Sequence, residues 1–189
     1  MANKVKFGLK NVHYAVVTET ADAQTGAITS TYTTPKAWKG AVSITMDPSG
    51  ENSPFYADDS VFYDVPVNNG YTGTLEIADV PEDVETDVFG YEKDATSGIV
   101  VEKSTSTRKY IALLFEFMGD AEKRRFCFYR CILQRPSVAS STTTETVEVG
   151  TDSLAITVSP RPDDNVVKAK ANESDAAYAN WYTAVPTAS

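Results

Sequence analysis

The chain has 189 residues, 42% hydrophobic and 11% aromatic, and its 26 acidic and 17 basic residues give a net charge of −9. A chain of this length buries about 70% of its unfolded surface, which excludes disorder throughout and makes disulfides or metal unnecessary for a core. No window approaches the roughly 20 apolar residues of a membrane span, and the start lacks the apolar stretch of a signal peptide. The acidic balance disfavours tight binding to nucleic-acid phosphates. We therefore expect a soluble protein that stays in the cytoplasm where it is made.

Short runs rich in Val, Ile, Thr, Tyr and Phe, separated by Gly, Pro, Asn and Asp, predict a single mostly β domain over residues 1–160. The clearest strand pair covers residues 110–118 and 124–133. Both faces of the first of these strands are apolar, which is typical of a strand in the middle of a sandwich or at a subunit interface. Further strands are predicted at residues 11–17, 37–46, 61–67, 72–77, 99–103, 144–149 and 154–159.

One flanking α-helix is predicted over residues 79–90. Asp79 can cap it, Glu82 stands three residues later as in a capping box, Pro81 suits the first turn and Gly90 can end the helix. Its narrow apolar stripe, which would lie on the sheet, consists of Val80, Val84 and Val88.

Residues 47–60 predict a long loop between two strands, with two prolines, a glycine, several acids and two aromatic residues, Phe55 and Tyr56. Loops of this length in a compact domain are usually functional. Residues 47–94 contain 13 acidic residues and one basic residue, so they carry −12 while the rest of the chain carries +3. Two interpretations stay open: a solvated acidic surface, or an acidic surface that meets a weakly basic surface on a neighbouring copy.

Residues 161–189 show little hydrophobic periodicity, and we expect them to form a C-terminal arm or docking segment. It ends in an aromatic cluster, and such a cluster is expected to dock on another surface rather than stay in solvent. The three residues of this cluster are Tyr178, Trp181 and Tyr182.

The residues of enzyme sites are scarce, so we expect no enzymatic activity, no cofactor and no metal. Cys127 and Cys131 are four apart on a predicted strand, about 13 Å from each other on one face, which predicts two free thiols. His13, the one histidine, reads as an ordinary strand residue. The chain lacks the glycine patterns of nucleotide loops and serine-hydrolase turns. The carboxylate pairs Asp58–Asp59 and Asp163–Asp164 do not fit the spacing of a calcium loop.

Several passages occur in an order that resembles the phage major tail proteins, the tail tube proteins of long-tailed phages of the phi13 type. The resemblance covers nearly the whole chain and rests on the succession of the passages rather than on any one of them. They are residues 8–15 (GLKNVHYA), 69–82 (NGYTGTLEIADVPE), 89–92 (FGYE), 112–116 (ALLFE), 126–129 (FCFY) and 180–182 (NWY).

The resemblance implies a β-sandwich or barrel-like tail-tube fold and a structural virion protein that assembles into stacked hexameric rings. It further implies a location in the virion tail after synthesis in the host bacterial cytoplasm, contacts with the tape-measure protein and other tail proteins, no membrane anchor, and passage of DNA without specific binding. Residues 37–46 and 61–67 would line the lumen. The resemblance places ring stacking in Asp47, Glu51, Phe55, Tyr56, Asp58 and Asp59, and lumen-facing acids at Asp58, Asp59 and Asp64.

Two other functions remain compatible with the sequence. A tail-completion or baseplate protein would share the fold but form one ring. A carbohydrate-binding β-sandwich would present aromatic residues on a concave face. The aromatic residues available for that face are Trp38, Tyr56, Tyr63 and Trp181.

Overall fold

The structure is a computed structural model that describes residues 7–51, 53–138 and 150–187. Within these ranges it is mostly β, with a single short α-helix, as the sequence predicts. Its elements in chain order are β1 (Leu9–Ala21), β2 (Ile28–Tyr32), β3 (Lys36–Ala37), β4 (Ala41–Ser49), β5 (Ser53–Ala57), β6 (Ser60–Val65), β7 (Gly70–Ile77), α1 (Glu82–Asp87), β8 (Glu92–Lys93), β9 (Val100–Val101), β10 (Ile111–Phe117), β11 (Arg125–Leu133), β12 (Asp152–Val158), β13 (Lys168–Ala171) and the 3₁₀ helix η1 (Ala176–Tyr178).

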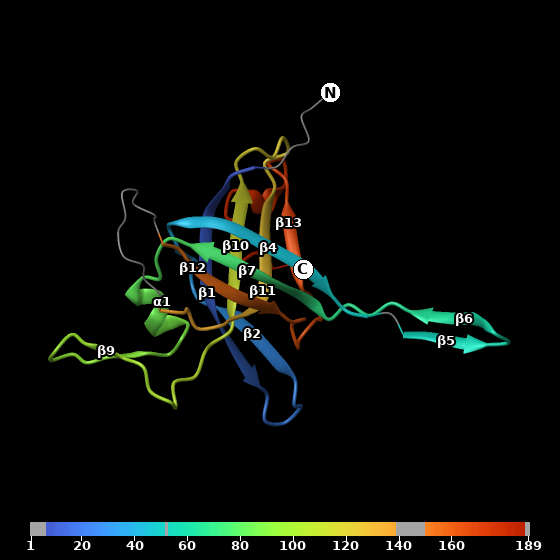
Figure 1. The fold of residues 1–189 in the computed structure, drawn as a ribbon, viewed down its shortest axis with the longest axis horizontal. Helices are drawn as coiled ribbons and strands as arrows, with labels where there is room; N and C mark the ends of the chain where they lie inside the picture. Colours follow the sequence, from blue (N-terminus) through green and yellow to red (C-terminus); the bar gives the residue numbers. More distant parts are fainter. Residues whose placement is uncertain (1–6, 52, 139–149, 188–189) are drawn as a thin grey trace.

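One large antiparallel sheet forms the body, in the order β2-β1-β10-β11-β12-β7-β4. The sheet divides at β11, where β13 pairs with residues 125–128 and β12 pairs with residues 131–133. Beyond this point the sheet folds over itself, so that β12, β7 and β4 lie across β1, β10 and β11 (Figure 1). We call these the front layer and the back layer. The arrangement is sandwich-like, and among the described residues the sheet does not close into a barrel because β2 and β4 remain edge strands.

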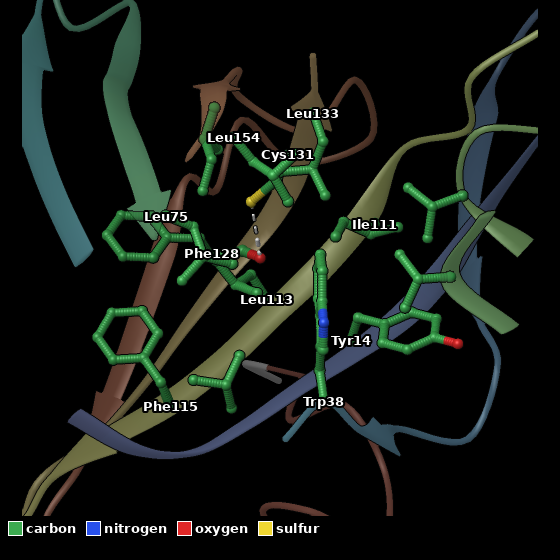
Figure 2. Close-up of a cluster of buried hydrophobic side chains, with 14 of the residues drawn as sticks. Tyr14, Trp38, Leu75, Ile111, Leu113, Phe115, Phe128, Cys131, Leu133 and Leu154 are labelled. Carbon is green, nitrogen blue, oxygen red and sulfur yellow. Dashed lines mark hydrogen bonds between the residues drawn. The ribbon is translucent and has the colours of Figure 1, made fainter. Parts of the chain in front are cut away.

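The first core fills the space between the two layers (Figure 2). Leu75 and Leu154 enter it from the front layer, and Leu113 and Phe115 enter it from the back layer. Helix α1 adds the buried Val84, and its C-cap residue Val88 is also buried, while Val80 of the predicted stripe packs at the margin. Trp38 is 1% exposed, and its indole Nε1 donates a hydrogen bond to the Asp79 carbonyl at 3.3 Å.

The second core lies on the other side of the back layer, under the C-terminal segment. Leu114 and Tyr129 point into it, and Trp181 covers it with 2% of its surface exposed. Tyr129 Oη donates a hydrogen bond to the Pro186 carbonyl at 2.7 Å, which ties the end of the chain to β11. The two apolar faces of β10 predicted from the sequence are therefore both buried, and the strand lies in the middle of the fold.

The cysteines are free and buried, as predicted, but they do not share a face. Cys131 belongs to the first core and Cys127 to the second. The pairing of β10 with β11 shifts between Ile111 and Leu113, and this β-bulge adds one residue to β11 and reverses the direction of the side chains that follow. Burial raises the pKa of both thiols.

Several predicted boundaries were wrong. The helix begins at Glu82 after Pro81, and Asp79 makes no side-chain cap. The predicted strand at 37–46 is broken into β3 and β4 because Trp38 turns into the core and Gly40 takes a φ of 93°. The predicted strand at 99–103 shortens to β9, and the one at 144–149 falls outside the described residues. His13 is a strand residue, as predicted, and lies in β1. Its ring stacks on the Tyr182 ring, with 4.4 Å between the ring centres.

Candidate assembly surfaces

Strands β5 and β6 form a hairpin that pairs with no other strand in the described structure and projects from the body (Figure 1). Its turn has two residues, Asp58 and Asp59, with φ of 50° and 57°, between the paired residues Ala57 and Ser60. A two-residue turn with both φ angles positive is the type I′ turn that matches the twist of a hairpin. The carboxylate pair is thus the tip of a β-hairpin.

The predicted long loop at 47–60 was therefore wrong. Its first residues complete β4, where Pro48 is tolerated because β4 is an edge strand. Its later residues form β5 and the turn. Two prolines and several acids gave the segment the composition of a loop, and Asp-Asp at the turn is a weaker hairpin signal than Asn-Gly.

The hairpin exposes aromatic side chains. Phe62 is 73% exposed and Tyr63 is 63% exposed, and both belong to β6. On β5, Phe55 stands opposite Tyr63 in the register and Tyr56 stands opposite Val61. An isolated two-stranded hairpin is marginally stable in water, so this one gains most from a surface that covers it.

Three of the predicted acids lie on this projection, and two lie before it in the chain. Asp58 and Asp59 form its tip and are exposed, and Asp64 is exposed on β6 opposite Pro54. Asp47 lies on β4, and Glu51 lies in the connection that leads to β5, both exposed. The resemblance implies that residues 37–46 and 61–67 line the lumen, and this stays a prediction. In the described structure β4 pairs with β7, and β6 pairs with β5 alone.

The outer face of the front layer is a second candidate surface, which sequence reasoning missed. Strands β7 and β12 alternate strictly, and β4 alternates from Ser43 onward, after a register shift between Ala41 and Ser43. Inward residues such as Leu75 therefore fill the first core while their neighbours face outward. The outward residues align in three rows across the strands. The rows are Ser43–Glu76–Ser153, Thr45–Thr74–Ala155 and Asp47–Thr72–Thr157. We call this surface the polar face.

The polar face consists mainly of hydroxyl side chains, and its two charged residues, Asp47 and Glu76, are both carboxylates. Thr151 Oγ1 donates a hydrogen bond to Glu76 at 2.7 Å, and Ser43 Oγ donates another at 3.0 Å. These hydrogen bonds, first from Thr151 and then from Ser43, hold the pKa of Glu76 below its ordinary value, so that it stays charged. The signal that could have revealed the face is the alternation Thr72–Thr74–Glu76 between apolar residues.

The C-terminal cluster makes its contacts within its own chain. The Arg125 guanidinium lies 3.7 Å from the centre of the Tyr178 ring and 4.7 Å from that of Tyr182. Trp181 Nε1 donates a hydrogen bond to the Phe126 carbonyl at 3.4 Å. The predicted docking residues thus lie on the back layer, where they cover the second core.

Other proposed sites lose support from the structure. Trp38 and Trp181 are buried, so they are not part of an exposed aromatic platform for sugars. Asp163 and Asp164 lie 2.7 Å and 3.1 Å from the Arg161 guanidinium, and Arg161 lowers the pKa of Asp163. Among the described residues, no group of three His, Cys, Asp or Glu could hold a metal ion, and no helix is long and apolar enough to cross a membrane.

The described residues thus form a sandwich-like sheet with a mainly polar outer face and a projecting hairpin. The family model of phage tail tube proteins matches residues 4–183, nearly the full length. The chain therefore belongs to the phage tail tube protein family, as its sequence resemblance indicated. No curated protein matches it in sequence. It is a structural protein of the virion tail that assembles with itself and with other tail components.

Proposed function

We propose that six copies form a ring, that rings stack into the tail tube, and that the β5–β6 hairpin makes the contact between stacked rings. The observation that carries this proposal is the hairpin itself, which extends beyond the body with Phe62 and Tyr63 exposed. An aromatic side chain offers about 150–250 Å² to bury. Half of that area on both residues, at about 25 cal/mol per Å², contributes about 4–6 kcal/mol per subunit before ordering costs.

The polar face supports a second part of the proposal, that the front layer lines the lumen through which DNA leaves the capsid. Carboxylates repel phosphates, and hydroxyl groups offer no fixed positive charge that would hold them. Such a wall lets DNA slide. The lumen-facing role of Asp58, Asp59 and Asp64 stays a prediction, since these residues lie on the hairpin rather than on the polar face.

The remaining parts of the proposal follow from a tube of this kind. Its lumen holds the tape-measure protein before ejection, its ends contact other tail proteins, and the subunit is made in the host cytoplasm. A tail-completion or baseplate protein would form a single ring instead. The hairpin favours the stacked tube, because a lone ring would leave the aromatic residues of the hairpin in water.

Electron microscopy of the native chain and of a variant in which a Gly-Ser turn replaces residues 51–66 tests the proposal. The replacement keeps Gly50, whose φ is 144°, and the hydrogen bond from Asn69 N to the Ser49 carbonyl, so the ends of β4 and β7 remain joined. We expect six-fold tubes from the native chain. We expect the variant to fold with an unchanged melting temperature and to form no long tubes.

A point variant provides the matched control. Val138→Ser changes an exposed apolar residue of the body and should leave tubes intact. Long tubes from the hairpin replacement would place the axial contact elsewhere. Single rings from the native chain would favour the completion or baseplate function.

A further inference from the structure

A cleft of about 280 Å³ opens where the start of β1 passes the connection from β3 to β4. One wall is formed by residues 9–13 and the other by residues 37–41. The apolar lining of the cleft includes Leu9, Ala37 and Ala41, which are partly or fully exposed, while Trp38 lies buried behind them. Only the segment of β1 around His13 and Tyr14 pairs with β3, so in the described structure the backbone of residues 9–11 has a strand partner on the β10 side alone.

The cleft is basic. Its lining contains Lys10, His13 and Lys39 and no carboxylate. Lys10 Nζ lies 3.2 Å from Glu116 Oε1, so this carboxylate compensates part of the charge of Lys10. Lys39 is exposed and forms no ion pair with any described residue. An acidic partner would therefore gain most from Lys39.

The β5–β6 hairpin has the complementary composition. Residues 53–65 contain Asp58, Asp59 and Asp64 and no basic residue, and they expose Phe62 and Tyr63 beside the acids. An acidic tip with aromatic flanks matches a cleft that is lined by lysines and by the apolar residues Leu9, Ala37 and Ala41. We infer that this cleft is the receptor for the β5–β6 hairpin of a second copy of the chain. This inference rests on the proposed function and names the surface that the hairpin contacts.

The positions of the two surfaces agree with this pairing. The hairpin follows the last residue of β4, Ser49, and the cleft includes its first residue, Ala41. The hairpin and the cleft thus lie at opposite ends of β4. A contact between unlike surfaces at opposite ends is heterologous, and it repeats from copy to copy without limit unless it closes on itself. The pairing is therefore compatible with a stack in which the hairpins of each ring contact the next ring.

Cysteine cross-linking in assembled tails tests the inference directly. The native cysteines are both buried, so they should not form disulfides with a pair of introduced cysteines. Phe62→Cys on the hairpin and Ala37→Cys in the cleft, placed together in phage particles, should give a ladder of covalent multimers after oxidation. The matched control combines Phe62→Cys with Ile99→Cys, an exposed residue beside β9. We expect no ladder from this control.

Charge reversal provides an independent measurement. Lys39→Glu should raise the protein concentration needed for tube growth about tenfold. Lys170→Glu, an exposed lysine on β13, should leave it unchanged. Normal tubes without a Phe62–Ala37 ladder, or equal effects of the two reversals, would overturn the receptor and leave the proposed function standing. Absence of tubes from the native chain would instead contradict the proposed function.

Discussion

The two layers of the sheet differ in what covers them. The back layer has a core on each side, because the C-terminal segment packs against its outer surface. The front layer has the first core on its inner side and solvent on its outer side, where the polar face lies. One layer is therefore completed within the subunit. The other presents a surface of mainly hydroxyl groups and carboxylates that covers no core within the described structure.

The sequences of the strands explain this difference. Residues 111–115 of β10 are all apolar, which suits a strand buried on both faces. Residues 72–77 of β7 alternate, so that Leu75 and Ile77 enter the core while Thr74 and Glu76 face outward. The polar face covers no core, so it needs no apolar residues for the stability of the subunit. Its composition is therefore free to serve the function.

Truncation of a buried leucine should have the largest effect on stability. Leu113 and Leu114 are fully buried on opposite faces of β10, so we expect Leu113→Ala and Leu114→Ala each to lower the free energy of unfolding by about 2–5 kcal/mol. On the polar face, Thr72→Ala should change it by about 0.5 kcal/mol or less. Urea unfolding at pH 7 measures all three. A small effect of Leu114→Ala would show that the second core is not part of the cooperative unit.

An intermediate effect is expected at the buried carboxylate of the back layer. Burial alone would raise the pKa of Glu116, but hydrogen bonds from Arg125, Lys10 and Asn11 outweigh it and hold this pKa below its ordinary value. A lowered folded-state pKa stabilises the protein above the unfolded pKa of about 4.3, and this stability is lost as the pH falls through the folded value. We expect Glu116→Gln to cost about 1–3 kcal/mol at pH 7.

The same variant should flatten the acid side of the stability curve, because one of the groups that titrates on unfolding is gone. Unfolding in urea at pH 7 and at a series of lower pH values measures this change. Glu122→Gln is the control, since the Glu122 side chain is 64% exposed and lies 3.7 Å from Arg124. It should cost less than about 1 kcal/mol. Equal losses from the two variants would mean that Glu116 contributes no more than a surface charge.

Much of the fold could be predicted from the sequence, because apolar runs and alternation identify strands directly. The pair β10–β11, the β7 strand and the existence of the helix follow from such patterns. The bulge in β11 could not be predicted, because nothing in the run from Cys127 to Cys131 marks an extra residue. The division of β11 between β12 and β13 depends on contacts far apart in the chain, which local patterns do not encode.

The candidate surfaces were predicted unevenly. The region of Phe55 and Tyr56 was singled out by its acids and aromatic residues, although it forms a hairpin rather than a loop. The polar face was missed because its rows join three strands, and the partner of each threonine is known only from the register. The cleft around Lys39 was missed for the same reason, since residues 9–13 and 37–41 meet only in the fold.

A substitution at the centre of the polar face should have the smallest effect on stability. It also tests most directly whether the front layer faces the DNA. Thr74 is exposed between Thr45 and Ala155, so Thr74→Lys should change the free energy of unfolding by about 0.5 kcal/mol or less and should permit assembly. If the face lines the lumen, each ring then carries added positive charges toward the DNA, which attract phosphates. We expect slower DNA ejection from particles carrying this variant, and more so at low salt. Thr74→Gln, which is polar but uncharged, is the control. Equal ejection rates from the two variants at low salt would mean that the polar face does not meet the DNA.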